Sequence, residues 1–302
     1  MISRPLAAAI VGLCGLSTLV ACGSLEVWGG SEAPDATSPA AATRTANPPR
    51  ADAKSPARTH TTAQTTSQGR SQEDTSQRDA QAKPLAGKVI VIDPGHNANN
   101  WRHPQEINKQ VDVLTKRKAC DTTGTSTNDG YSEPAFTWDV SNRLVKRLKE
   151  LGARVRLTRT ADTPWGPCIT ERAAIGNRAR AVAAISIHAD GAPSNGHGFH
   201  VIIPRKIDGP VDPVVDDSER LGRKIRNAYR HGTGLPYSNY LGKNALDFRS
   251  DLGGLNLSEV PKIFIECGNM RNAQDAAKLK DEGFRQRIAD SLARGLRDYL
   301  LT

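Results

Sequence analysis

Residues 88–97 read KVIVIDPGHN, and this stretch decides how the rest of the chain is interpreted. Its run of β-branched residues is typical of a strand that is buried on both faces, as in a parallel sheet. The Asp-Pro-Gly that follows ends the strand, because proline fixes φ and glycine permits conformations that a Cβ would forbid. His96 is therefore expected on a tight turn past the carboxyl end of a core strand, where ligands bind in open α/β sheets. The alternative is an ordinary core strand whose turn contains a histidine by chance.

Strand-like and helix-like segments alternate along the rest of the chain. Apolar runs predict further strands at 153–159, 183–190, 199–203 and 262–268, and apolar residues at helical spacing predict helices at 132–152, 170–184, 219–232 and 284–301. This alternation predicts one three-layer α/β domain, with helices flanking a mostly parallel mixed sheet of about six strands. The polar segment 97–130 is expected to be a long functional or mobile loop. The Gly/Asn-rich segment 234–256 is expected to line a groove.

The first 21 residues have the pattern of a secretory signal of the lipoprotein type. Arg4 supplies a positive start, an apolar stretch follows, and residues 19–22 read LVAC, which resembles a bacterial lipobox. We favour cleavage before Cys22 and lipidation of its thiol. Cleavage at a nearby position, without lipidation, is the alternative.

Residues 22–84 are predicted to be a disordered tether. From 31 to 83 there is no Val, Ile, Leu, Met, Phe, Trp, Tyr or Cys, so this stretch cannot bury enough apolar area to offset its ordering entropy. The catalytic domain is then expected at residues 85–302, a length that can bury a substantial core. Such a tether suits a domain that is held at a membrane surface and acts on something beyond it.

The formal charge of +9 does not by itself identify a partner. Dense runs of Lys and Arg interleaved with aromatic residues are missing from the sequence, so nucleic-acid binding is disfavoured. Attraction to an anionic envelope polymer or lipid surface is compatible with the charge and with export.

Three of the five cysteines lie in the expected domain: Cys120, Cys168 and Cys267. Cys120 and Cys168 are in loop-like surroundings, whereas Cys267 ends an apolar strand, where a buried free thiol is common. Because export permits disulfides, we predict a Cys120–Cys168 bond. Two free thiols or a cysteine-ligated metal are the alternatives, although no Cys-x-x-Cys spacing supports the metal.

Four polar side chains lie where predicted strands end or a helix begins: His96, Glu133, His188 and Glu266. Two imidazoles and one carboxylate are a normal Zn²⁺ ligand set in hydrolases, with a fourth position left for water or substrate. A second carboxylate that is not a ligand can carry the proton to the leaving nitrogen. We therefore predict His96, Glu133 and His188 as zinc ligands and Glu266 as the general base and acid.

Other interpretations of these residues stay open at this point. Glu106 competes with Glu133 for the carboxylate position, since no His-Glu-x-x-His motif fixes the spacing. Glu133 is also explained as a carboxylate favoured by a helix dipole, and a metal-free binding domain is the alternative for the whole set. Arg172 is a helix-packing residue as readily as a site residue. His200 is expected to be a strand residue that faces the site edge or solvent.

The sequence resembles the zinc-dependent N-acetylmuramoyl-L-alanine amidases of the amidase-3 family. The resemblance rests on VIDPGH at 91–96, a glutamate before a helix, SIHA at 186–189 and IECGNM at 265–270, in this order. It spans essentially residues 87–302. It is greatest to single-domain secreted actinobacterial members, which also carry a GTSTNxGYxE loop, here residues 124–133, and a Gly-Pro-Cys that pairs with an upstream cysteine. The long 97–130 segment departs from the wider family pattern.

The resemblance implies an enzyme that hydrolyses the amide between N-acetylmuramic acid and L-alanine (EC 3.5.1.28). It carries the metal-ligand roles over to His96, Glu133 and His188, with one Zn²⁺ per chain, and the catalytic role to Glu266. The match of the loop favours Glu133 over Glu106, and the Gly-Pro-Cys match again implies the Cys120–Cys168 pair.

The expected substrate is peptidoglycan or a muropeptide. We expect a monomer in the cell envelope, lipid-anchored to the outer face of the cytoplasmic membrane or otherwise secreted or periplasmic, with no nucleic-acid partner. Another zinc-dependent cell-wall peptidase, or a non-catalytic envelope-binding lipoprotein, is the alternative.

Overall fold

The structure is a computed structural model that describes residues 83–302. The predicted signal of residues 1–21, Cys22 and nearly all of the predicted tether lie outside the described residues. Among the helices of residues 83–302, none has the length and apolarity that a membrane span requires.

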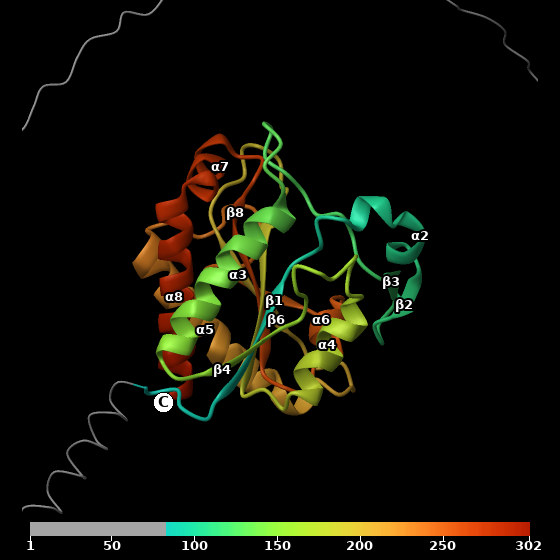
Figure 1. The fold of residues 1–302 in the computed structure, drawn as a ribbon, viewed down its shortest axis with the longest axis vertical. Coiled ribbons are helices and arrows are strands. Elements are labelled where there is room, and N and C mark those ends of the chain that lie inside the picture. The colour runs from blue at the N-terminus through green and yellow to red at the C-terminus, as the bar shows by residue number, and fades with distance from the viewer. Residues whose placement is uncertain (1–82) are drawn as a thin grey trace, which may run out of the picture. The chain divides into compact units, whose positions relative to one another are not determined.

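A six-stranded sheet forms the centre of the domain (Figure 1). Its strands in spatial order are β4 (Arg154–Leu157), β1 (Val89–Pro94), β5 (Ala183–Asp190), β8 (Lys262–Asn269), β6 (His200–Pro204) and β7 (Leu246–Arg249). The pairs β4–β1, β1–β5 and β5–β8 are parallel, β6 runs antiparallel to β8, and β7 is parallel to β6. The carboxyl ends of β1, β5 and β8 therefore meet at one edge of the sheet.

Helices cover both faces of this sheet, as predicted for a three-layer domain (Figure 1). One face carries α3 (Glu133–Glu150), α5 (Val215–Thr233) and α8 (Glu282–Leu300), and the other carries α4 (Ile169–Arg178) and α6 (Gly253–Asn256). The 3-10 turn η2 (Asp212–Val214) leads into α5, and α7 (Ala273–Lys280) follows β8.

The main core lies between the sheet and α3, α5 and α8. On α3, the fully buried Phe136, Val140, Leu144 and Leu148 recur at helical spacing, so one stripe of the helix faces the sheet. In β1, Ile90 and Ile92 contribute to the same core, whereas Val91 faces a smaller cluster beneath α4. A strand buried on both faces is what the continuous apolar run of β1 predicts.

The 97–130 segment contains more regular structure than the sequence suggests. It includes η1 (Asn100–Arg102), α2 (Pro104–Ile107) and an antiparallel hairpin of β2 (Gln110–Asp112) and β3 (Arg117–Ala119). Cys120 directly follows the hairpin and forms the expected disulfide with Cys168, while Cys267 is a buried free thiol. This segment is therefore fastened beside the carboxyl edge of the sheet.

The predicted fold class is confirmed, but some boundaries were wrong. The helix expected at 170–184 ends at Arg178, because Arg180 has φ 45° and the chain then enters β5. Its apolar periodicity continues to Val182 only because the next strand begins there. The segment 234–256 holds β7 and α6, neither of which was expected.

Candidate metal centre and active site

His96 lies on a constrained turn directly after β1. It has φ 57°, a left-handed conformation that is uncommon for residues other than glycine. The turn is fixed on both sides: the Gly95 amide donates to the Ile187 carbonyl (3.0 Å), and the Thr137 hydroxyl donates to the Gly95 carbonyl (2.8 Å). An uncommon conformation held by neighbouring elements is typical of functional sites.

Glu133 and His188 meet His96 at the carboxyl edge of the sheet. Glu133 is the first residue of α3, and His188 is near the end of β5. One Glu133 oxygen lies 3.2 Å from His96 Nε2, and the other lies 3.0 Å from His188 Nδ1. One donor atom from each of the three residues falls within 4.8 Å of the others, so together they could hold one metal ion. In the part of the chain that the structure describes, this is the only such group.

Two glycines allow the three side chains to come so close together. A Cβ on Gly95 would lie less than 3.0 Å from atoms of the His188 ring, and a Cβ on Gly124 would lie 2.8 Å from a Glu133 oxygen. Gly124 also has φ +75°, which favours glycine. The glycines of the DPGH and GTSTN motifs therefore have a packing reason at this site.

In this cluster, burial and the neighbouring charges act in opposite directions on the pKa values of His96 and Glu133. Burial alone would lower the pKa of His96, but the carboxylates of Glu133 and Asp121 raise it to about 10. Burial opposes ionisation of Glu133, yet the two histidines hold its pKa well below the usual range. The protein without metal thus holds an anionic carboxylate between imidazoles, and a cation could replace the protons there.

Glu266 lies opposite His188 in the pairing of β8 with β5. Its Oε2 atom is buried and has no hydrogen-bond partner. Burial raises the pKa of this carboxyl well above its ordinary value, and the negative charges of Glu133 and Asp190 raise it further. A carboxyl with a raised pKa binds a proton readily near neutral pH, as a group that must take a proton and later return it requires.

Two cavities adjoin the four residues. One, of about 230 Å³, extends along the α4 and α6 side of the sheet and is lined by Phe264, Arg249 and Leu252, among others. The other, of about 250 Å³, opens beside Thr125 and Asp190. His96, His188 and Glu266 line both cavities. The cluster therefore borders both cavities.

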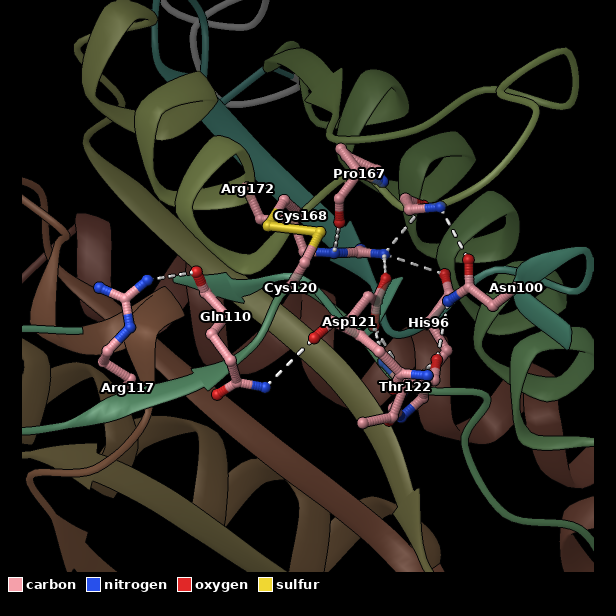
Figure 2. The surroundings of a disulfide bond; sticks show 12 residues. His96, Asn100, Gln110, Arg117, Cys120, Asp121, Thr122, Pro167, Cys168 and Arg172 are labelled. Carbon is pink, nitrogen blue, oxygen red and sulfur yellow. Dashed lines mark hydrogen bonds and ion pairs between the residues drawn. A yellow bond between two sulfur atoms is a disulfide. The ribbon is translucent and has the colours of Figure 1, made fainter. Parts of the chain in front are cut away.

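Arg172 of α4 is buried beneath the site and fastens the His96 turn (Figure 2). Its guanidinium donates to the Asp121 carboxylate (2.9 Å), the Asp93 carboxylate (2.8 Å) and the His96 carbonyl (3.1 Å). Asp121 follows the disulfide-bonded Cys120, as Figure 2 shows, and one of its oxygens lies 3.5 Å from His96 Nδ1. Arg172 thus has a supporting role at the site, one of the two interpretations that the sequence left open.

The competing candidates lie elsewhere. Glu106 is on α2 and pairs with His103 at 3.8 Å, away from the metal cluster. His200 is buried on β6, where it pairs with Glu266 in the strand register. Its expected place toward solvent was therefore wrong, whereas its position opposite Glu266 is compatible with the alternative of the site edge. Asp121 was missed, since a loop position carries no periodic signal.

Comparison with known proteins agrees with this geometry. A sequence profile of N-acetylmuramoyl-L-alanine amidases matches residues 90–298. The chain belongs to this amidase family. It is 41% identical to the N-acetylmuramoyl-L-alanine amidase Rv3717 of Mycobacterium tuberculosis over 220 residues, which are 72% of this chain and 88% of the relative.

Solved amidase structures match the fold as well. The N-acetylmuramyl-L-alanine amidase Ami1 of Mycobacterium smegmatis matches with a TM-score of 0.67 and 39% identity, over 72% of this chain and 98% of that one. Ami1 of Mycobacterium abscessus, in its apo form, matches with a TM-score of 0.66 and 40% identity, over 72% and 100%. The chain is accordingly an N-acetylmuramoyl-L-alanine amidase (EC 3.5.1.28) that cleaves peptidoglycan, and it acts outside the cytoplasm.

Proposed function

We propose that this amidase binds one Zn²⁺ through His96, Glu133 and His188, and that Glu266 carries the proton during hydrolysis. One observation carries the proposal: three donor atoms lie within 4.8 Å of one another beside a buried carboxyl that has an unpartnered oxygen. An unpartnered buried oxygen is costly, so it calls for a functional explanation.

The donor set fits zinc. Two imidazoles and one carboxylate are the ligands of several zinc hydrolases, and they leave one coordination position for water or substrate. Calcium and magnesium prefer sets made only of oxygen ligands, which two histidines do not supply. The His96 and His188 side chains are each about one-seventh exposed, so solvent can reach the position that the protein leaves free.

The chemistry then divides between the metal and Glu266. A bound Zn²⁺ would polarise the amide carbonyl, activate the attacking water and favour the ionised form of the nearby Glu266. The Glu266 carboxylate takes one proton from the water while the water oxygen bonds to the carbonyl carbon of the amide. The carbon–nitrogen bond breaks, and Glu266 returns the proton to the alanine nitrogen. The products are the lactyl carboxylic acid of muramic acid, which releases its proton to solvent, and a peptide whose first residue is L-alanine.

The surroundings of Glu266 support the second half of this cycle. Because burial and the charges of Glu133 and Asp190 raise its pKa, the protonated carboxyl keeps its proton at neutral pH until a stronger base is present. The departing amine is such a base. Glu266 is thus placed to act first as base and then as acid.

Substitution of Glu266 and His188 separates the two roles. Glu266→Ala should retain one zinc per chain by metal analysis, while turnover of a muropeptide falls by roughly two to four orders of magnitude. His188→Ala should lose bound zinc. Near-normal cleavage by Glu266→Ala would remove the proton-carrier role, and undiminished zinc in His188→Ala would remove the ligand role.

We further propose that the mature enzyme is a monomer anchored to the outer face of the cytoplasmic membrane through lipidated Cys22, with residues 22–84 as a tether. The lipobox-like LVAC at 19–22 and the lack of large apolar residues from 31 to 83 support this proposal. Mass spectrometry of the mature amino terminus tests it. A diacylglyceryl-modified Cys22 is expected in the native chain, and an unmodified amino terminus elsewhere would refute the anchor.

A further inference from the structure

The two ring nitrogens of His188 have different partners. Nδ1 lies 3.0 Å from the Glu133 carboxylate, on the side of the proposed metal, and Nε2 lies 3.1 Å from the Ser186 hydroxyl. The ring plane is fixed by Phe264, whose ring stacks nearly parallel to it with 5.1 Å between the centroids. The ring therefore keeps Nε2 beside the Ser186 hydroxyl. Whether Nε2 carries a proton then depends on whether this hydroxyl donates a hydrogen to Nε2 or accepts one from it.

The Ser186 hydroxyl is committed to Asp93. Asp93 is fully buried, and its carboxylate receives the ammonium of Lys262 (3.1 Å) and the guanidinium of Arg172 (2.8 Å). A buried carboxylate held between two cations is ionised, and an ionised carboxylate only accepts hydrogen bonds. Ser186 Oγ lies 2.9 Å from Asp93 Oδ2, so the hydroxyl must be the donor in this contact.

A serine hydroxyl has one hydrogen. Since Asp93 takes that hydrogen, only oxygen lone pairs remain for His188, and Nε2 must be the donor in their contact. We infer that Asp93, acting through Ser186, holds a proton on Nε2 of His188 and thereby reserves Nδ1 for the metal. Ser186 and Asp93 are thus positioning residues, one and two steps removed from His188, and this inference rests on the proposed zinc ligation.

His96 is controlled in the opposite sense. Its Nδ1 lies 3.1 Å from the backbone carbonyl of Thr122, which can only accept, so Nδ1 carries the proton and Nε2 faces Glu133. The two histidines should therefore bind the metal through different nitrogens, Nε2 of His96 and Nδ1 of His188. Partners that fix the tautomer of a ligating histidine raise metal affinity by about 10- to 100-fold in other proteins.

The test measures the tautomer and the metal affinity on the full zinc-loaded chain. Long-range ¹H–¹⁵N spectra distinguish a protonated, a free and a metal-bound imidazole nitrogen, and competition with a chelator gives the zinc dissociation constant. The wild-type spectrum should show His188 protonated at Nε2 and bound to metal at Nδ1. Ser186→Ala should raise the zinc dissociation constant by about 10- to 100-fold.

Two matched variants separate this role from general destabilisation. Ser141→Ala removes another fully buried serine hydroxyl, one without a hydrogen-bond partner, and Thr158→Val removes a different donor to Asp93 (2.6 Å) without touching Ser186. Both should keep the zinc dissociation constant within about twofold, given that neither contacts a ligand.

Two results would overturn the inference. One is metal bound through Nε2 of His188 in the wild type, a measurement that needs no variant to fold. The other is a folded Ser186→Ala protein with wild-type zinc affinity. A wild-type chain that binds no zinc would instead refute the proposed function, so the two failures can be told apart.

Discussion

Replacing Arg172 by methionine gives the sharpest test of how the fold supports the site. The guanidinium is buried on α4 and joins two carboxylates, Asp93 and Asp121, that no other residue within 83–302 connects. It also donates to four backbone carbonyls, those of residues 94, 96, 166 and 167. Methionine fills part of the volume but supplies no donor and no charge.

The magnitude follows from what is left behind. Removing one partner of a buried ion pair costs about 3–5 kcal/mol, because the remaining charge is uncompensated. Lys262 still faces Asp93, whereas Asp121 loses its only cationic partner among the described side chains other than the His96 ring. We therefore expect Arg172→Met to lower the free energy of unfolding by about 4 kcal/mol at pH 7.

The loss should depend on pH in a defined direction. Arg172 opposes the effect of burial and holds the pKa of Asp121 at about 2, and Lys262 together with Arg172 holds the pKa of Asp93 lower still. A carboxyl whose pKa is depressed by folding stabilises the protein above its unfolded pKa of about 3.9, and this contribution disappears as the pH falls toward the folded value. The difference between wild type and Arg172→Met should thus be largest at pH 7 and shrink between about pH 4 and pH 2.

Urea unfolding followed by circular dichroism, at several pH values, measures this difference. Arg178→Met is the matched control, since Arg178 lies on the same helix but forms only an exposed pair with Glu171. Its unfolding midpoint should stay at the wild-type value. A loss below 1 kcal/mol for Arg172→Met, or a loss that grows on acidification, would refute the assignment of Arg172 as the charged link beneath the His96 turn.

Three further predictions concern the same edge of the sheet. The double variant Cys120→Ser/Cys168→Ser removes a bond between cysteines 48 residues apart, so it should lower the free energy of unfolding by about 4 kcal/mol in the loop-entropy model. It should also slow hydrolysis, because Asp121 is held less firmly without the bond. Urea unfolding and a muropeptide assay measure the two effects, and an unchanged unfolding midpoint would contradict the first. Gly95→Ala should displace the His188 ring and reduce kcat/KM at least about tenfold, which corresponds to a loss of only about 1.4 kcal/mol of transition-state stabilisation. Gly176→Ala is the control, because no atom would lie closer than 3.5 Å to its new Cβ, and it should keep the wild-type kcat/KM. Equal kcat/KM values for the two variants would count against the packing argument. Asp251→Asn should speed amide hydrogen exchange in the β2–β3 hairpin, because Asp251 forms ion pairs with Lys116 and Lys118 of that hairpin. Unchanged exchange rates would show that these ion pairs do not stabilise the hairpin.

Much of the fold could be predicted because β1, β5 and β8 are largely buried on both faces and therefore have mostly apolar sequences before their polar carboxyl ends. β7 could not, because its sequence LDFR is short and half polar, and it becomes a strand only through its pairing with β6. The β2–β3 hairpin was missed for a similar reason: each strand has only three residues, none of them fully buried, and tertiary contacts hold them.

The predicted site depended on one topological rule. Side chains at the carboxyl ends of parallel strands lie at one edge, so His96, His188 and Glu266 could be expected together, and a helix that begins at that edge could add Glu133. The layer beneath them could not be foreseen. Arg172 and Asp121 are 51 residues apart, and Asp93 and Lys262 are 169 apart, so nothing in the local sequence links either pair.

The most direct test of the central claim is mass spectrometry of a muropeptide digest made by the wild-type chain before chelation, after chelation and after zinc is restored. Zinc-dependent hydrolysis of the amide predicts peptides that begin with L-alanine before chelation and none after chelation. The same peptides should return once zinc is restored. Cleavage that persists without metal, or fragments cut within the stem peptide with no free L-alanine terminus, would contradict the claim.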